Sequence, residues 1–445
     1  MKRVVIVICL LLVTLCALCA ETVNLERARE LALVNSRTLA KYNLSIKNSI
    51  LDEKSQRYSM LPSPSAEYSA SMSYLDKDWG FVNPIDTLTA GATFAITQTI
   101  FEGGKNFIKK SINEMATESL RKEALAEYFN VIDAADSAYY AVLEAAASLE
   151  AAESFLQTAV LSLTMADIRQ SSGMITRGEY LRALAEKELQ ENSRNQARRN
   201  LALNMAKLNT LIGLSGTSEL EQIDFRAYEE LIQRLTGISV EEADVLYARL
   251  WETFAQTNPS LARAALNSQR AEKNLSLAKR DYSPTISATI FTTGINYTTA
   301  NGFTSSSGGG ISIRGIIPID FWVMGNRIEK NKIARDSAAL DYIGAESSLE
   351  TELQSALISA FAQAESVLSS RRSLEYTEKH FEYELERYRL AQSSLSDFAE
   401  ASSLLINSRN SYIKASYGFL QSLSKLRSLG AIDDEEKLIH ILMGK

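Results

Sequence analysis

The segment from Lys105 to Ser172 runs for 68 residues without a glycine or a proline. Alanine, leucine, glutamate and lysine are frequent in it, and these residues have high helix propensity. At a rise of about 1.5 Å per residue, the segment predicts one continuous helix of about 100 Å. A stripe of apolar residues, spaced by three and four, runs along it from Leu120 to Leu156. This spacing is typical of coiled coils, although a helix in an ordinary bundle would carry the same stripe.

A strand-like segment comes directly before this predicted helix. Between Thr87 and Phe101 apolar residues alternate with threonine, glycine and alanine, which is the period of two expected of a β-strand. A second alternating segment, from Ala66 to Tyr74, precedes it across a polar loop at 75–86, so the two predict a hairpin. Upstream of the hairpin, residues 24–57 predict a helix, which ends before the prolines that follow it.

The second half of the chain repeats the first at a nearly constant offset. Pro284 follows Pro62 by 222 residues, and Gly325 follows Gly103 by the same interval. A second run without glycine or proline also occurs, after Gly344. The predicted strands of this half lie at 285–290 and 311–319 around a Ser- and Gly-rich loop at 298–308. We therefore expect two structural repeats. The expected boundaries are 21–213 for the first repeat, 214–240 for a linker, 241–430 for the second repeat and 431–445 for a tail.

The amino terminus has the features of a secretory signal peptide. Two basic residues precede an apolar run at 4–15, and small residues follow. Residues 1–20 are therefore expected to be removed. All three cysteines lie within this segment, at Cys9, Cys16 and Cys19, so we expect a mature chain without disulfides or cysteine-bound metals. The alternative is a lipid anchor on Cys19, which the bulky residue before it disfavours.

Composition disfavours several classes of function. The chain has 47 Lys and Arg against 54 Asp and Glu, a net charge of −7, which disfavours nucleic acid as a partner. Its two histidines, His380 and His440, have no neighbouring cysteine or histidine in the sequence. A packed or surface role for them is therefore favoured over a metal-binding or catalytic one. We expect no enzyme activity, no metal and no cofactor.

The predicted hairpins have the character of membrane-spanning strands. Each strand has about ten residues, with an apolar face and a face rich in hydroxyl groups. Four strands cannot close a barrel, and an open sheet edge in lipid would leave backbone groups unpaired at a cost of several kcal/mol each. The chain is therefore expected to oligomerise, and three copies would supply twelve strands. A soluble sheet capping a helical bundle would explain the alternation but not the signal peptide or the long helices.

The sequence resembles the TolC-like outer membrane efflux proteins over nearly all of its mature length. The resemblance rests on Leu61-Pro62, on the junction at 100–104 (Ile-Phe-Glu-Gly-Gly), on the spacing of Gly173, Glu179 and Ala183, and on the repeat itself. It implies a mainly α fold with membrane β-strands. In that fold a homotrimer forms a twelve-stranded β-barrel, with four strands per chain, that crosses the outer membrane and continues as a long α-helical barrel into the periplasm. The implied partners are a periplasmic adaptor (membrane fusion) protein, an inner-membrane transporter of the RND, ABC or MFS type, and outer membrane lipid.

The resemblance also implies a gate near the tips of the long helical hairpins. Asp397 and Glu400 match positions at which the family projects acidic residues into the lumen. Three chains would then bring six carboxylates together, which would raise some of their pKa values and attract cations. The simpler alternative is that Asp397 only caps a helix. Tyr388 and Glu179 match positions of the family's gate network.

Two departures from the family pattern concern the latch of this gate. Ser393 replaces the family's gate arginine, and Ala391 stands where a glycine is usual. The candidates to take over the latch are Arg177, Arg387 and Arg389. The tip residues expected to contact the adaptor are Gly173, Thr176, Ala391 and Ser394.

The leading hypothesis is therefore an outer membrane channel of a tripartite efflux or type I secretion system, acting as a passive exit duct gated at its periplasmic end. Conduction needs a hydroxyl-lined lumen and a gate but no active site. The alternative is a structural coiled-coil protein of the envelope, which the interposed hairpins disfavour.

Overall fold

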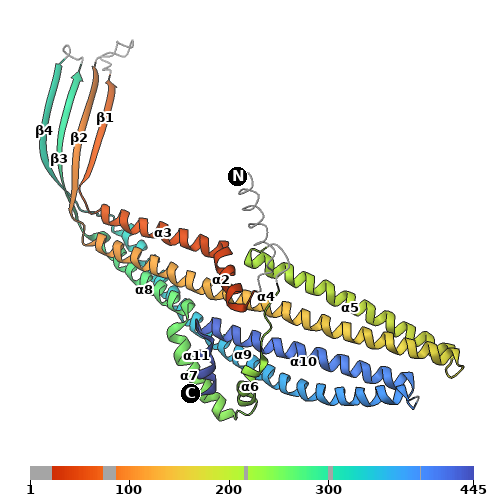
Figure 1. The fold of residues 1–445 in the computed structure, drawn as a ribbon. Coiled ribbons are helices and arrows are strands. Elements are labelled where there is room, and N and C mark those ends of the chain that lie inside the picture. The colour runs from red at the N-terminus through yellow and green to blue at the C-terminus, as the bar shows by residue number, and fades with distance from the viewer. Residues whose placement is uncertain (1–22, 74–86, 215–218, 299–303, 391, 445) are drawn as a thin grey trace, which may run out of the picture. The chain divides into compact units, whose positions relative to one another are not determined.

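The computed structural model describes residues 23–73, 87–214, 219–298, 304–390 and 392–444 (Figure 1). The predicted signal peptide with its cysteines, all of the predicted loop at 75–86, and Ala391 lie outside the described residues. The elements of the first half are α2 (Leu25–Asn35), α3 (Arg37–Tyr58), β1 (Ser63–Ser73), β2 (Thr87–Phe101), α4 (Lys105–Ser171) and α5 (Arg177–Ile212). Those of the second half are α7 (Val240–Thr257), α8 (Pro259–Lys279), η2 (Arg280–Tyr282), β3 (Thr285–Thr298), β4 (Thr304–Ile316), α9 (Phe321–Arg389) and α10 (Leu395–Gly430). Between and after the halves lie η1 (Phe225–Tyr228), α6 (Glu229–Thr236) and α11 (Glu435–Met443).

The order helix, helix, strand, strand, long helix, helix thus occurs twice, as the sequence repeat predicts. The predicted long helix is confirmed as α4, which has 67 residues, and its counterpart α9 has 69. None of the helices in the described residues combines the length and the apolar character needed to cross a membrane.

The chain divides into two compact units. The helical unit comprises Met1–Lys41, Ala124–Pro259 and Glu346–Lys445. The sheet unit comprises Tyr42–Glu123 and Ser260–Ala345.

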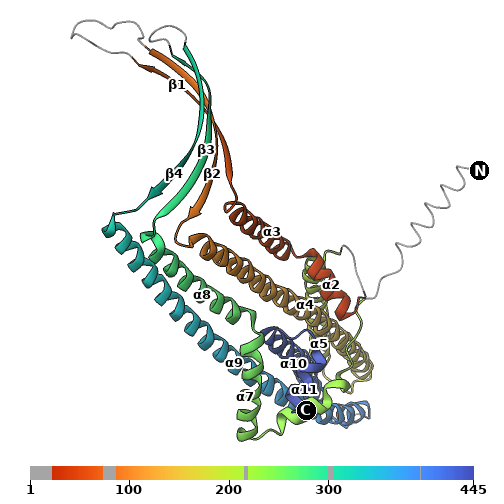
Figure 2. The same cartoon turned by 90° about the vertical axis from the view of Figure 1, so that its left-hand side faces the viewer.

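The sheet unit contains four antiparallel strands in the order β1-β2-β3-β4 (Figure 2). Phe94 pairs with Ala66, Ile96 with Ile290, and Ile290 with Ile311, so one face of the sheet is apolar. The opposite face carries hydroxyl groups, including a 3.1 Å hydrogen bond between the Thr97 and Thr289 side chains. Strands β1 and β4 form the two edges of the sheet.

Strand β4 differs from its predicted position. It begins at Thr304, inside the predicted loop, and it ends at Ile316, before the predicted end at 319. The glycines at 308–310 allow this, because they pair closely with β3. A Cβ at Gly309 would lie 3.0 Å from the Phe291 carbonyl oxygen, and the Thr293 hydroxyl bonds the backbone of Gly308. A glycine-rich segment that resembles a loop in sequence is therefore a strand.

The predicted helix at 24–57 is two helices, α2 and α3, separated at Ser36. This residue has an extended backbone (φ −67°, ψ 110°), and its hydroxyl accepts a 3.2 Å hydrogen bond from the Leu39 amide. The serine side chain thus starts the second helix, as helix-capping residues do. The helical periodicity continues on both sides of the break, so it did not reveal the break.

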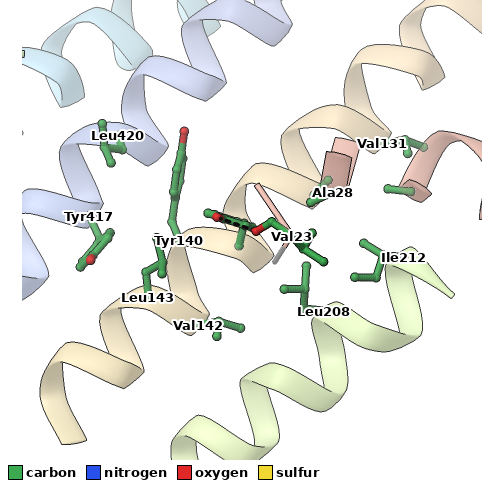
Figure 3. Close-up of a cluster of buried hydrophobic side chains, with 13 residues drawn as sticks. Val23, Ala28, Val131, Tyr140, Val142, Leu143, Leu208, Ile212, Tyr417 and Leu420 are labelled. Carbon is green, nitrogen blue, oxygen red and sulfur yellow. Dashed lines mark hydrogen bonds between the residues drawn. The ribbon is translucent and has the colours of Figure 1, made fainter. Parts of the chain in front are cut away.

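The core of the helical unit lies around the middle of α4. Tyr139 and Tyr140 are buried there against α2, α5 and α10 (Figure 3). The Tyr139 hydroxyl lies 3.1 Å from the Val23 carbonyl oxygen and 2.7 Å from that of Glu221. Burial raises the pKa of Tyr139 to about 12. Because Val23 also forms a parallel bridge with Leu220, the segment before α2 and the segment after α5 are both anchored to this core.

A buried ionic cluster lies in the same unit. Asp136, on α4, has no solvent exposure and accepts hydrogen bonds from Arg29 (2.6 and 3.0 Å), Arg427 (2.6 Å) and Ser424 (2.8 Å). One carboxylate therefore connects α2, α4 and α10. Buried charges of this kind are tolerated when they are paired and fully hydrogen-bonded.

Candidate gate at the helix tips

Two helical hairpins end in tight turns within the helical unit (Figure 1). The first turn connects α4 to α5. Gly173 adopts a left-handed backbone there (φ 73°), and the Met174 amide donates a 2.8 Å hydrogen bond back to the Arg169 carbonyl. This is the usual way in which glycine ends a helix. The second turn connects α9 to α10, and the Gln392 amide donates a 2.8 Å hydrogen bond to the Arg387 carbonyl.

Both outgoing helices begin with a capping box. The Glu179 carboxylate accepts a 2.8 Å hydrogen bond from the Thr176 amide, and the Thr176 hydroxyl accepts one of 3.2 Å from the Glu179 amide. Ser394 and Asp397 form the same pair of bonds, each of 3.2 Å, at the start of α10. Reciprocal bonds of this type pair backbone groups that the helix itself leaves unsatisfied.

Asp397 therefore caps α10, as the simpler alternative expected. Hydrogen bonds from the side chain and backbone of Ser394 hold the pKa of the Asp397 carboxyl below its usual value. The side chain is nevertheless exposed, so capping leaves it in contact with solvent. Glu179 has the equivalent capping role at the first tip.

Tyr388 lies at the centre of the packing between the two tips. It is only 2% exposed and stacks on Phe398, with the ring centroids 5.0 Å apart and the planes at 13°. The same cluster includes Ala166 of α4 and Ala183 of α5, so residues of both hairpins surround the tyrosine. Aromatic pairs in this geometry contribute about 0.5–1.5 kcal/mol beyond the burial of their area.

Arg169, in the last turn of α4, connects the first hairpin to the second. Its guanidinium carbon lies 4.4 Å from the centroid of the Tyr388 ring, and one guanidinium nitrogen donates a hydrogen bond to the Tyr388 backbone carbonyl. Arg169 therefore makes both a cation–π contact and a charge-assisted hydrogen bond to the second hairpin.

The second turn has a polar network of its own. Glu384 is 5% exposed and accepts hydrogen bonds of 2.8 Å from the Ser393 hydroxyl and 2.8 Å from the Arg387 guanidinium. Arg387 also donates a 3.0 Å hydrogen bond to the Gln392 carbonyl. The bond from Ser393, together with the bond and charge of Arg387, lowers the pKa of the Glu384 carboxyl. Ser393, which the sequence resemblance predicts to stand at the position of a gate arginine, is thus a donor within this turn.

The three arginines predicted as candidates for the latch of the gate differ in position. Arg387 belongs to the turn network, whereas Arg389 forms an exposed 2.7 Å ion pair with Glu386, one turn earlier on the same helix. Arg177 is exposed at the first position of α5. Arg387 is bonded to Gln392 in the turn that follows α9, and among the described residues of that turn neither of the other two arginines has such a bond.

Glu400 lies apart from the capping box. It is exposed on α10 and lines a cavity of about 320 Å³ between α4, α5 and α10. Arg182, Glu186 and the buried Gln190 line the same cavity, and Gln190 donates a 2.8 Å hydrogen bond to Glu186.

The sequence matches the family model of outer membrane efflux proteins at residues 28–214 and 250–431, which include both long hairpins and all four strands. The chain belongs to this family. This efflux protein is accordingly a component of the bacterial outer membrane.

Solved structures of outer membrane channels share its fold. The structure of CusC has a TM-score of 0.77 and 15% identity, covering 91% of each chain. The outer membrane channel CmeC of Campylobacter jejuni has a TM-score of 0.72 and 17% identity, covering 93% of this chain and 88% of its own. The outer membrane protein VceC of Vibrio cholerae has a TM-score of 0.73 and 15% identity, covering 91% of this chain and 96% of its own. Among curated protein sequences, none matches the efflux protein.

Sequence reasoning missed Arg169, Glu384 and Phe398 as parts of the tip cluster. Arg169 looks like an ordinary basic residue in the last turn of a helix, where cations are favoured on any helix. Its partner, the carbonyl of Tyr388, lies 219 residues further along the chain. Glu384 lies on a charge-rich helix, and its burial follows from the folding of the turn over it.

Proposed function

We propose that three copies of this efflux protein form a passive exit duct through the outer membrane, closed at its periplasmic end by the helix tips. The observation that carries the proposal is the four-stranded sheet with one apolar face and two unpaired edges. In lipid, the unpaired backbone groups of β1 and β4 would each cost several kcal/mol. Pairing β1 of one copy with β4 of the next satisfies these groups, and three copies give a twelve-stranded barrel.

The tip cluster supports a gate at the other end of the duct. Arg169 of the first hairpin contacts Tyr388 of the second, and Ala166 and Ala183 pack in the same cluster, so one relative movement of the hairpins would break these contacts. Opening of the duct would therefore consist of sliding α9 and α10 past α4 and α5. In the closed trimer the exposed carboxylates of Asp397 would meet near the axis and attract cations.

Energy for export would come from partners, since a duct needs no catalytic step. We propose a periplasmic adaptor that binds at the helix tips and an inner-membrane transporter that selects the cargo, as in a tripartite efflux or type I secretion system. The adaptor-contact residues proposed here are those of the two exposed turns, Gly173, Thr176 and Ser394.

The test is the mass and the conductance of the detergent-extracted, full-length protein. We expect a trimer that forms discrete, cation-sensitive channels in a planar bilayer. A stable monomer or dimer that never conducts would overturn the proposal and favour a structural coiled-coil protein of the envelope.

Two variants separate the charge of Asp397 from its role as a cap. Asp397→Asn keeps a side-chain oxygen for the cap but removes the charge, whereas Asp397→Ala removes both. We expect both variants to lose cation block. If block persists in both variants, the acidic-ring part of the proposal is wrong, while the duct itself stands on the trimer and its conductance.

A further inference from the structure

A pocket lies at the junction between strand and helix in the sheet unit. Its volume is about 370 Å³, and it lies between the end of β2, the start of α4 and the residue Met60 that follows α3. Ile100, Phe101 and Phe107 supply further apolar side chains of its lining. Glu102 supplies an acidic side chain to the same lining.

One of the two carboxylate oxygens of Glu102 lacks a hydrogen-bond partner among the described residues. Its Oε1 atom is buried and makes no hydrogen bond to any of the residues that the structure describes. Buried carboxylate oxygens are normally paired, because an unpaired one has lost its hydration without compensation. A donor from outside the chain would therefore complete this site.

Two cationic side chains of the same junction, Lys105 and Arg280, bind groups other than the Glu102 carboxylate. Lys105 forms a 3.1 Å ion pair with Asp281, and the Arg280 guanidinium donates a hydrogen bond to the Gly103 carbonyl. Asn106, which also lines the pocket, accepts a 3.1 Å hydrogen bond from Gln56. Among the described residues, none of these groups bonds to Oε1 of Glu102.

The backbone of the turn holds Glu102 in place. Gly103 and Gly104 both adopt left-handed conformations, with φ values of 65° and 75°. A Cβ at Gly103 would lie 2.4 Å from the Ser283 side chain, so the turn has little room to move toward that neighbour. The backbone that carries Glu102 is therefore held in one conformation, which lowers the cost of ordering on binding.

The surroundings of the pocket fit the surface of a membrane. Ile100 is 61% exposed and Phe107 is 73% exposed, and they lie where the strands that cross the membrane end. Aromatic side chains are enriched at this depth in outer membrane proteins, at the level of the lipid headgroups.

We propose that this pocket binds the ammonium group of an ethanolamine phospholipid. The ammonium donates a hydrogen bond to the carboxylate of Glu102 and pairs with its charge. The rings of Phe101 and Phe107 offer aromatic surface to the cation, and the apolar side chains beside them contact the glycerol and acyl region. A choline headgroup has no N–H to donate, so it cannot form this hydrogen bond to the carboxylate. The proposal rests on the outer membrane placement of the sheet in the proposed function.

The test measures retention of phospholipid by the full-length protein in lipid nanodiscs, using mass spectrometry of the intact complex. Nanodiscs contain either phosphatidylethanolamine or phosphatidylcholine as the test lipid. We expect retention of phosphatidylethanolamine in preference to phosphatidylcholine. Glu102→Gln should reduce that retention by about tenfold or more, as expected for loss of a charge-assisted hydrogen bond.

Two further variants keep the test interpretable. Glu118→Gln removes a partly exposed carboxylate of α4 that does not line the pocket, and it should leave lipid retention unchanged. Phe107→Ala removes an exposed ring and should weaken retention even if Glu102→Gln folds poorly. The oligomeric mass is measured for every variant. A protein that does not form a trimer would contradict the proposed function, whereas a trimer without lipid preference would contradict only the lipid site.

Three outcomes would overturn the proposal. The first is equal retention of the two lipids, and the second is equal retention by the wild type and Glu102→Gln. The third is a trimer structure in which a cationic side chain of a neighbouring copy, or a metal ion removable by a chelator, occupies the pocket.

Discussion

Replacing Arg169 by alanine should open the proposed gate. The arginine contributes a charge-assisted hydrogen bond to the Tyr388 carbonyl and a cation–π contact at 4.4 Å. Such a hydrogen bond contributes about 1.5–3 kcal/mol and the ring contact about 0.5–2 kcal/mol. Because Arg169 is only partly buried, we take about 2–4 kcal/mol for the two together. At about 1.4 kcal/mol per factor of ten, Arg169→Ala should shift the closed-to-open equilibrium about 30- to 1000-fold toward open.

The assay is the open probability of single channels in planar bilayers at fixed voltage and salt. Arg389→Ala is the matched control, because it removes an arginine whose ion pair lies on the exposed surface of α9. Tyr388→Phe is a second control, which tests whether the tyrosine hydroxyl takes part in closure. The bond from Arg169 goes to the backbone carbonyl of Tyr388 and not to its hydroxyl, so the phenylalanine variant should stay closed.

Two results would refute this reasoning. One is an open probability for Arg169→Ala that equals that of the wild type and of Arg389→Ala. The other is opening by Tyr388→Phe to the extent seen with Arg169→Ala, because the tyrosine hydroxyl would then be the group that holds the gate.

Three further predictions follow from other parts of the protein. Asp136→Ala removes the buried carboxylate that accepts hydrogen bonds from the buried Arg427 and the partly buried Arg29, and it should cost about 3–5 kcal/mol, seen as a lower thermal midpoint of the extracted protein. Glu30→Ala, which removes an exposed pair, should leave that midpoint unchanged, and equal midpoints for the two variants would contradict the prediction. Gly103→Ala forces a side chain into a left-handed turn and against a serine side chain 2.4 Å away, so less protein should reach the outer membrane as folded trimer. At Gly344 a Cβ would meet no atom within 4 Å, so Gly344→Ala should be tolerated. Similar yields of trimer for Gly103→Ala and Gly344→Ala would show that the turn at Gly103 is not strained. Glu384 has a pKa below its usual 4.5, so its stabilisation of the second tip is complete above about pH 4.5 and is lost as the pH falls further. Open probability should therefore rise on acidification below that pH, and a Glu384→Gln channel that keeps the same acid response would exclude this carboxylate as its cause.

Features that depend on near neighbours in the chain were predictable from the sequence. The long helix from Lys105 follows from helix propensity without interruption, and the strands follow from alternation. The capping box at Thr176 and Glu179 is recognisable because its two partners are three residues apart. The repeat was visible because glycine and proline recur at matching positions.

Features that depend on distant partners were decided only by the tertiary structure. Glycines 308–310 look like a loop until the close approach of β3 makes them a strand. Arg169 looks like any helix-terminal cation until folding brings the Tyr388 carbonyl to it. Likewise, the unpaired oxygen of Glu102 becomes visible only once the surrounding pocket has formed. The sequence by itself therefore determined the helices, the strands and their repeat, because local propensity and periodicity govern these elements. The tertiary structure decided which polar groups are buried and paired at the tips and at the junction, because desolvation and hydrogen bonding there depend on residues far apart in the chain.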